Sequence, residues 1–365
     1  MSHLFDPLAI RGVRFPNRVF VSPMCEYSST DGFANDWHFV HLGSRAVGGA
    51  GLIFTEATAV TPEGRISPED LGIWKDDHVD MLARIARFVH EQGSVMGMQL
   101  AHAGRKASTY RPWSGDGAVS EDDGGWNNVI APTALAFSDR YPQPREMSKT
   151  DILETTKAFA TAAGRAHAAG LRVIEIHAAH GYLLHEFLSP LSNQRHDEYG
   201  GSFENRTRLL REVATAIRRV WPEDLPLFTR ISATDWVEGG WDIEQSIQLA
   251  RELKTLGVDL IDCSTGGNVA TAKIPIGPGY QTPFAERIRR DAAILTGAVG
   301  MITTPEQAEH IVGTGQADAV LIAREMLRDP YFPLRAARAL GQEITWPAQY
   351  LRAGPRGAKS RQPIT

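Results

Sequence analysis

Eight short apolar runs recur along almost the whole chain, and this repetition constrains the fold more than any other feature of the sequence. The runs span 18–24, 52–60, 94–100, 172–178, 225–232, 259–266, 293–300 and 318–324. Between some of them, apolar residues recur at every third or fourth position up to a glycine or a proline, as in amphipathic helices. These stretches are 78–93, 204–221, 243–257 and 304–315. The chain is therefore predicted to alternate strands with helices in an α/β fold.

Eight strands that alternate with helices match the (β/α)₈ TIM barrel, and the runs are apolar on both faces, as a parallel sheet covered by helices requires. The competing fold is a doubly wound open sheet, which usually carries G-x-G-x-x-G after its first strand, or else G-x-x-x-x-G-K-[ST]. Neither motif occurs in the chain. We therefore predict a single barrel over 1–345 and a C-terminal tail over 346–365, of which 357–365 is expected to be disordered.

One interval interrupts the alternation of strands and helices. Residues 102–149 contain several prolines and many glycines and show little periodicity. Irregular segments of this length inside a compact domain are usually functional lids or small excursions. We expect a long excursion or lid after the third strand.

Composition excludes several classes of function. The net charge of -5, without a run of lysine and arginine in the body of the chain, argues against nucleic-acid binding. No stretch is long and apolar enough for a membrane span, and the first residues resemble no signal peptide. Cys25 and Cys263 lie far apart, which suits a reducing cytoplasm and suggests neither disulfides nor zinc. The protein is expected to be cytoplasmic and to act on small molecules.

The fourth run leads into a dense group of polar residues, EIHAAHGYLLHEFLSP, over 175–190. In a barrel, chemistry takes place at the C-terminal ends of the strands. His177, His180 and His185 could bind zinc only if all three turned inward, and no H-E-x-x-H pattern supports this. A metal-dependent barrel hydrolase therefore stays a remote alternative. His185 is expected in a helix that begins near Tyr182, as a hydrogen-bonded corner residue.

His177 and His180 are better suited to a reduction. Two imidazoles at a barrel mouth can donate hydrogen bonds to one carbonyl oxygen, and the phenol of Tyr182 can deliver a proton beside it. Electrons must then come from a cofactor. The loops after the last two strands commonly bind phosphorylated cofactors, and there Gly300 permits close backbone approach and Arg324 can pair with a phosphate. Arg230 could place a fixed positive charge beside a reduced ring.

Long segments of the chain resemble the Old Yellow Enzyme family of FMN-dependent ene-reductases. They begin at SPMCEYSSTDGF, MQLAHAGRKAS, EIHAAHGYLLHEFLSP, RISATDWVEGGW and IGPGYQTPFAERIR, and the match spans essentially the whole chain. The cysteine in SPMC, the tyrosine two positions later and the short lid are similar to the thermophilic-like subgroup. The resemblance implies tightly bound FMN and no metal.

The resemblance also implies roles for individual residues. The expected FMN contacts are Ser22, Pro23, Met24, Cys25, Ala57, Gln99, Arg230, Gly300, Ala323 and Arg324. Ala323 departs from the family, which commonly has glycine there. His177 and His180 would hold the activating oxygen of the substrate, and Tyr27 would contact the substrate on the opposite side. Tyr182 would donate a proton to Cα.

The implied reaction is the reduction of electrophilic alkenes such as α,β-unsaturated carbonyl compounds by a ping-pong hydride transfer through flavin N5. NADPH or NADH would be the reductant. A flavin diaphorase that reduces quinones or nitro compounds is the main alternative. The tail segment PAQYLRAGPRG resembles one that crosses to a neighbouring subunit, where Arg352 would enter the active site. A homodimer or homotetramer is therefore expected.

Overall fold

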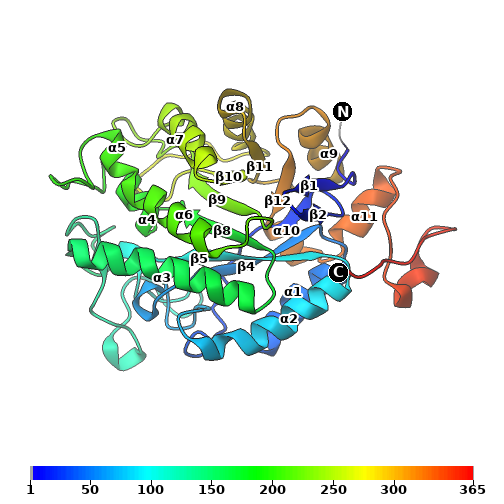
Figure 1. Cartoon of the computed structure of the whole chain (residues 1–365), viewed down its shortest axis with the longest axis horizontal. Helices are drawn as coiled ribbons and strands as arrows, with labels where there is room; N and C mark the ends of the chain where they lie inside the picture. The colour runs from blue at the N-terminus through cyan, green and yellow to red at the C-terminus, as the bar shows by residue number, and fades with distance from the viewer. Residues whose placement is uncertain (1–2, 365) are drawn as a thin grey trace.

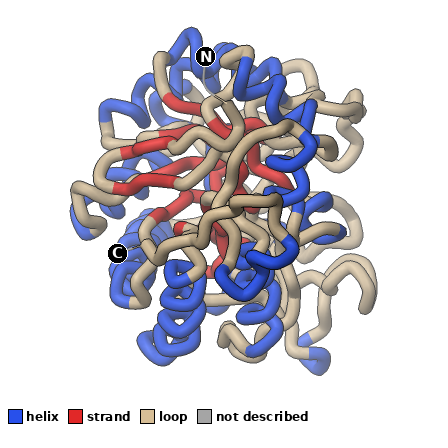
Figure 2. Tube along the Cα trace, turned by 90° about the vertical axis from the view of Figure 1, so that its right-hand side faces the viewer, coloured by secondary structure: helices blue, strands red, loops and turns tan. Residues whose placement is uncertain are grey.

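A computed structural model describes residues 3–364 as a closed barrel of eight parallel strands surrounded by helices (Figures 1 and 2). The strands are β3 (Val19–Val21), β4 (Leu52–Ala59), β5 (Val95–Ala101), β8 (Val173–Ala178), β9 (Leu227–Ser232), β10 (Leu260–Ser264), β11 (Leu295–Ala298) and β12 (Ala319–Ile322). Around the barrel their order is β10-β11-β12-β3-β4-β5-β8-β9. Each predicted run overlaps one of these strands, so the predicted TIM barrel is confirmed.

The helices lie outside the strands. They are α1 (Asp36–Val47), α2 (Val79–Glu91), α3 (Lys149–Ala168), α4 (Leu183–Leu188), α5 (Phe203–Arg206), α6 (Arg208–Val220), α7 (Ile243–Thr255), α8 (Thr282–Ala292), α9 (Pro305–Gly313), α10 (Arg324–Arg328) and α11 (Phe332–Ala339). Three of the four predicted helices are found as α2, α7 and α9. The fourth, over 204–221, was wrong as one continuous helix, because it is interrupted at Thr207. There the Thr207 hydroxyl donates to the Phe203 and Glu204 carbonyls, 2.9 and 3.3 Å away, and such back-bonding to the preceding turn often bends a helix.

Two helices outside the predicted set begin at capping boxes. Asn35 accepts a hydrogen bond from the Trp37 N–H at the start of α1, and Ser148 accepts one from the Asp151 N–H at the start of α3. Such caps satisfy N–H groups that the first turn of a helix leaves without partners. The caps therefore fix where these two helices begin.

The N-terminal end of the barrel is sealed by aromatic side chains. The hairpin of β1 (Leu8–Ile10) and β2 (Val13–Phe15) places Phe15 against Phe20 and Phe228, with ring centroids 5.1 Å and 6.4 Å apart. All three rings are fully buried. Burial of one such ring stabilises the fold by roughly 1.5–3 kcal/mol. This apolar plug leaves only the opposite end of the barrel open for chemistry.

The excursion after the third barrel strand is largely irregular. Within 102–149 it contains the short helices η3 (Gly104–Lys106) and η4 (Glu121–Asp123) and the two-stranded sheet of β6 (Ile130–Ala131) and β7 (Arg145–Glu146). Trp113, from this excursion, meets the Tyr27 ring edge-on at a centroid distance of 5.7 Å. The excursion thus reaches a predicted substrate residue, and its action as a lid stays a prediction.

The C-terminal tail contains η5 (Ala348–Ala353) and then returns to the barrel. The expectation of a disordered end was wrong for 357–364. The Arg361 guanidinium donates to the carbonyls of Ala46 and Gln92 at 2.6 and 3.1 Å, where α1 and α2 end. The cation is favoured there because the last carbonyls of a helix are electronegative and lack partners. Arg361 therefore anchors the end of the tail.

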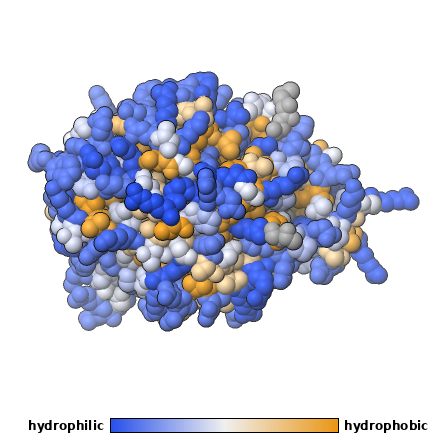
Figure 3. All heavy atoms as spheres, viewed as in Figure 1, coloured by the Kyte–Doolittle hydropathy of each residue, from blue (hydrophilic) through white to orange (hydrophobic). Residues whose placement is uncertain are grey.

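The outer surface is mainly hydrophilic, with scattered apolar residues on the face seen in Figure 3. Among residues 3–364, no helix has both the length and the apolar character that crossing a membrane requires.

Candidate active site

The topology brings most of the predicted site residues to one face of the barrel. Ser22 to Cys25 follow β3, Ala57 and Gln99 are paired in register on β4 and β5, and His177 and Arg230 are paired in register on β8 and β9. Gly300 follows β11, and Ala323 and Arg324 follow β12. Because all eight strands are parallel, their C-terminal ends share this face. Arg352 lies elsewhere, on η5, and is exposed.

His177, His180 and Tyr182 form a compact group where β8 leads into α4. The His177 ring meets the His180 ring and the Tyr182 ring edge-on, with both centroid distances at 5.1 Å. His180 Nε2 lies 2.7 Å from Ser264 Oγ, whereas His177 Nδ1 is buried without a partner among the described residues. A buried polar atom without a partner is rare in native structures. The His177 ring is therefore not tied to another side chain among the described residues.

The two imidazoles are neutral at ordinary pH. Desolvation in the site lowers the pKa of His177 and of His180 well below the usual value, and the positive charges of Arg230 and Lys106 act in the same direction. A neutral imidazole offers one N–H donor, which suits a carbonyl oxygen. The pair therefore offers hydrogen bonds without being protonated first.

Tyr27 and Tyr182 keep their protons. Desolvation raises the pKa of Tyr182 and of Tyr27, and the neighbouring Cys25 adds to both shifts. Both rings pack on an apolar cluster that includes Ile66 and, from the excursion, Val129. A buried phenol that stays protonated can donate a proton to a centre whose basicity rises during reaction.

A polar layer lies across the barrel lumen beneath these residues. Arg230 Nε is 2.5 Å from Asp262 Oδ2, and its Nη2 donates to Ser22 Oγ at 2.6 Å. Gln99 Nε2 donates to Glu175 Oε1 at 2.8 Å. All these side chains are buried. We refer to Gln99, Glu175, Arg230 and Asp262 as the polar layer.

The Glu175 carboxyl group of the polar layer holds a proton at neutral pH, because it is fully buried beside the charge of Asp262. Burial and the charge of Asp262 raise the pKa of Glu175 to about 8. Our sequence interpretation missed this role. The signal was the strand alternation, which places Glu175 on the same face as His177, and Asp262 on the same face as Ser264.

Lys106 is a second residue whose role was missed. Its Nζ donates to the His180 carbonyl at 2.8 Å and also to the Gly267 carbonyl. It lies 4.0 Å from the centroid of the Phe137 ring. Burial lowers its pKa to about 7. Lys106 thus joins the excursion to the segment that carries His180.

His185 is held apart from this group by its own contacts, in agreement with the corner role expected for it. It lies on α4, where its Nδ1 accepts a hydrogen bond from the Gly181 N–H at 2.9 Å, and it is fully buried. Residues 3–364 contain no group of three His, Cys, Asp or Glu side chains arranged to hold a metal ion. The three histidines therefore do not converge on one point.

The site fits a phosphorylated flavin. Gly300 has a φ of +124°, and a Cβ there would lie 2.9 Å from Gln281 Nε2, so this strand end requires glycine. Arg324, on the neighbouring strand end, is exposed and takes part in none of the ion pairs within 3–364. Both features suit a phosphate. The Gln99 amide and the Arg230 guanidinium can serve the polar edge of the isoalloxazine, so the donor set matches FMN.

Comparisons with known proteins agree with this geometry. Residues 3–343 match the sequence profile of the NADH:flavin oxidoreductase / NADH oxidase family. NADPH dehydrogenase of Geobacillus sp. (strain WCH70) is 53% identical over 351 residues, which is 96% of this chain and 98% of the relative. NADPH dehydrogenase of Bacillus subtilis (strain 168) is 51% identical, with the same coverage.

Solved structures with the same fold are also enzymes that act on small molecules. A morphinone reductase variant in complex with tetrahydroNAD superposes with a TM-score of 0.77 at 27% identity, covering 96% of this chain and 93% of that one. A 2-naphthoyl-CoA reductase superposes with a TM-score of 0.84 at 26% identity. That match covers 93% of this chain but only 52% of the reductase, which is a longer protein.

Proposed function

The chain belongs to the NADH:flavin oxidoreductase / NADH oxidase family, and on this premise we propose that it reduces the C=C bond of α,β-unsaturated carbonyl compounds. As a member of the family it is an FMN-dependent oxidoreductase that takes its electrons from NADH or NADPH. The observation that carries the proposal is the group of His177, His180 and Tyr182, in which two neutral imidazoles lie beside a protonated phenol. An electron carrier without its own substrate does not need such a group.

The strand ends would hold the cofactor. The residues proposed for this are Ser22, Pro23, Met24, Cys25, Ala57, Gln99, Arg230, Gly300, Ala323 and Arg324. When bound, FMN supplies the chemistry of accepting a hydride from the reductant and passing it to the alkene. Arg230 keeps a positive charge in the lumen, because its contact with Asp262 holds its pKa above the ordinary value despite burial. That charge favours an electron-rich ring above it.

His177 and His180 would orient and activate the substrate. Their N–H groups would donate to its carbonyl oxygen, where negative charge grows as the β-carbon is reduced. Tyr182 would give its proton to the α-carbon, and Tyr27 would limit the pocket on the other side. The excursion over 102–149 would exclude water as a lid, since Trp113 already packs on Tyr27.

We propose NADPH as the usual reductant, because both curated relatives described above are NADPH dehydrogenases. The nicotinamide and the alkene would use the same pocket in turn.

We further propose that the active protein is a homodimer or homotetramer, in which the tail over 346–365 completes the site of a neighbour. Arg352 is exposed and takes part in none of the ion pairs within 3–364. The C-terminal segment, red in Figure 1, lies at the opposite end of the long axis from α4 and α5, which follow β8. Arg352→Ala should raise the KM for cyclohexenone, and light scattering should give a mass of two or four chains. A monomer with unchanged KM would exclude this arrangement.

The experiment that tests the function is a visible absorption spectrum recorded without oxygen. The purified protein should show a flavin band that bleaches on addition of NADPH and returns on addition of cyclohexenone. Bleaching without return, together with return on addition of a quinone, would identify a diaphorase instead. Absence of a flavin band after incubation with FMN would contradict the whole assignment.

A further inference from the structure

The turn that carries His180 and Tyr182 adopts an unusual backbone conformation. It connects β8 to α4 through residues 179–182, and both His180 and Gly181 lie in the left-handed region, with φ of +62° and +71°. Histidine lacks the conformational freedom of glycine there. The conformation directs His180 and Tyr182 to the same side as His177. The surrounding structure must therefore hold this turn in place.

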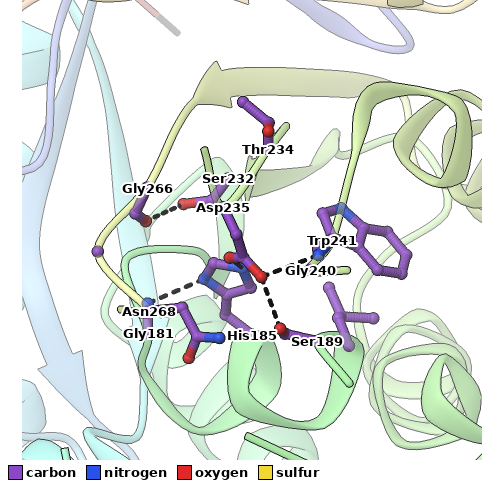
Figure 4. A network of polar contacts seen from close by, with 12 residues as sticks. Gly181, His185, Ser189, Ser232, Thr234, Asp235, Gly240, Trp241, Gly266 and Asn268 are labelled. Carbon is purple, nitrogen blue, oxygen red and sulfur yellow. Dashed lines mark hydrogen bonds and ion pairs between the residues drawn. The ribbon is translucent and has the colours of Figure 1, made fainter. Parts of the chain in front are cut away.

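Three contacts from other parts of the chain hold the backbone of the turn. The His180 N–H donates to Ser232 Oγ at 2.9 Å, and Lys106 Nζ donates to the His180 carbonyl at 2.8 Å. The Gly181 N–H donates to His185 Nδ1 at 2.9 Å (Figure 4). The backbone also packs on Gly267, whose carbonyl oxygen would lie 2.3 Å from a Cβ at position 181. Each of the two left-handed residues is thus fixed by its own contacts.

The contact at Gly181 requires one particular tautomer of His185. Nδ1 accepts a hydrogen bond, so the ring hydrogen must be on Nε2. Nε2 lies 3.0 Å from Asp235 Oδ1, which is ion-pair distance without the alignment of a hydrogen bond, and both side chains are completely buried. The carboxylate of Asp235 is therefore the group that favours a hydrogen on Nε2 and leaves Nδ1 free for Gly181.

Asp235 is itself held as an anion. Its Oδ2 accepts hydrogen bonds from Ser189 Oγ at 2.6 Å and from the Trp241 N–H at 2.9 Å, as Figure 4 shows. Burial alone would raise the pKa of this carboxyl group, but His185 and these donors bring it below the ordinary value. The carboxylate is thus fixed by α4 on one side and by the segment after β9 on the other.

We infer that His185 and Asp235 are positioning residues that act through the Gly181 N–H to hold His180 and Tyr182 in the orientation needed to polarise and protonate the substrate. The inference rests on the function proposed above for His180 and Tyr182. A buried histidine that only fills space would not need an acceptor at Nδ1, a hydrogen at Nε2 and an anion beyond it.

Two substitutions of His185 separate these contacts. In His185→Asn the amide oxygen takes the place of Nδ1, so the acceptor for Gly181 is kept and the contact with Asp235 is lost. In His185→Gln the amide reaches the place of Nε2, so the contact with Asp235 is kept and the acceptor for Gly181 is lost. Both variants lose the imidazole ring, so a difference between them does not come from the loss of its packing.

Asp235→Asn provides a test that keeps His185. The oxygen of the new side-chain amide would still accept the hydrogen bonds from Ser189 and Trp241. The NH₂ group of that amide would therefore face the His185 ring. An NH₂ group at this place favours the tautomer that carries its hydrogen on Nδ1. That hydrogen would oppose the Gly181 N–H. In the serine protease triad, a carboxylate likewise fixes the tautomer of a histidine. Asp235→Asn should therefore resemble His185→Gln, although it leaves the ring in place.

The measurements use the FMN-loaded proteins. Hydrogen–deuterium exchange of the peptide 178–184 should be faster in His185→Gln and in Asp235→Asn than in His185→Asn. After reduction, reoxidation by cyclohexenone should slow by about tenfold in the same two variants, which corresponds to the loss of one hydrogen bond. Reoxidation by dioxygen needs neither His180 nor Tyr182 and should stay unchanged.

Several results would overturn the inference. Equal exchange in the Asn and Gln variants of His185, or equal slowing of the cyclohexenone and dioxygen reactions, would reduce the pair to a purely structural role. If His185→Gln does not fold, Asp235→Asn tests the inference instead. The same two measurements apply: exchange of the peptide 178–184, and reoxidation by cyclohexenone compared with dioxygen. If the wild-type enzyme is not reoxidised by cyclohexenone, the proposed function fails, whereas the exchange comparison still decides whether the pair holds the turn.

Discussion

The Arg230 guanidinium on β9 donates a hydrogen bond of 2.6 Å to the hydroxyl of Ser22, which follows β3 on the opposite side of the closed barrel. The same guanidinium contacts Asp262 on the strand next to its own. Arg230 thus spans the lumen and fixes the segment from Ser22 to Cys25 relative to the polar layer. Because the proposed flavin contacts lie on both sides of this bridge, their spacing is set before any ligand binds.

Replacement of both His177 and His180 by alanine should lower turnover with cyclohexenone by at least about a hundredfold. The reason is the loss of the hydrogen bonds proposed to stabilise the charge that grows on the carbonyl oxygen. Turnover under saturating NADPH measures the effect, and the flavin absorbance of the purified variant serves as control, because neither residue is proposed to hold FMN. Unchanged enone reduction in this variant would contradict the assignment.

Tyr182→Phe should slow reoxidation by cyclohexenone by about a hundredfold, since a positioned acid contributes about 10²- to 10⁴-fold and water replaces it only in part. Bleaching by NADPH should be unaffected, because that step takes no proton from Tyr182. Rapid mixing of the reduced enzyme with cyclohexenone measures the rate. Tyr27→Phe is the matched control and should have a smaller effect; equal effects would remove the special role of Tyr182.

Glu175→Gln should flatten the dependence of the free energy of unfolding on pH. The folded-state pKa of Glu175 is about 8, against 4.5 ordinarily, so the native protein holds this proton more tightly than the unfolded chain. The stability that this proton contributes is complete below the ordinary pKa and is lost as the pH rises towards about 8. Glutamine can keep the hydrogen bond from Gln99 without a titrating proton.

Urea unfolding at a series of pH values measures this difference. The stability of the wild type relative to the variant should fall between pH 5 and 8, by an amount on the order of a few kcal/mol. The comparison must be between the two proteins, because Glu186 and Asp70 also have pKa values raised to about 8 by burial. A relative stability that rises with pH would show that Glu175 is ionised in the native state.

Gly300→Ala should weaken FMN binding by about tenfold or more, because a side chain at a φ of +124° costs on the order of 1–3 kcal/mol. The new Cβ would also press on Gln281, whose Nε2 is held by the Val299 carbonyl at 2.9 Å. Titration of the apoprotein with FMN measures the affinity. Gly277→Ala, which meets nothing within 4 Å, is the control and should bind FMN normally. Equal affinities would exclude Gly300 from the cofactor site.

The barrel could be predicted from the sequence because its strands are buried on both faces and therefore appear as short, mainly apolar runs. Helices α1 and α3 were harder to predict. On α1, Trp37 and Val40 are exposed, which blurs the apolar stripe. The buried face of α3 includes Ala162, Ala163 and Ala166, whose small side chains give little contrast with the exposed face.

The part of the candidate site that lies at strand ends could be predicted from the sequence. Strand ends meet at one face of a barrel, so His177, Arg230 and Arg324 could be assigned to it from the order of the runs alone. Contacts between strands could not be predicted in this way. Arg230 with Ser22, and His185 with Asp235, depend on the register and on the paths of loops, and neither is encoded in a local pattern.

The polar layer has a consequence for the life of the protein in the cell. Where other barrels fill the lumen with hydrocarbon, this one buries an amide, two carboxyl groups and a guanidinium beneath the place proposed for the flavin. A ligand that binds only the folded chain stabilises it in proportion to the logarithm of its concentration, and chains that unfold are removed by proteases. We therefore expect the half-life of the polypeptide to lengthen when the cell is rich in riboflavin and to shorten when it is starved.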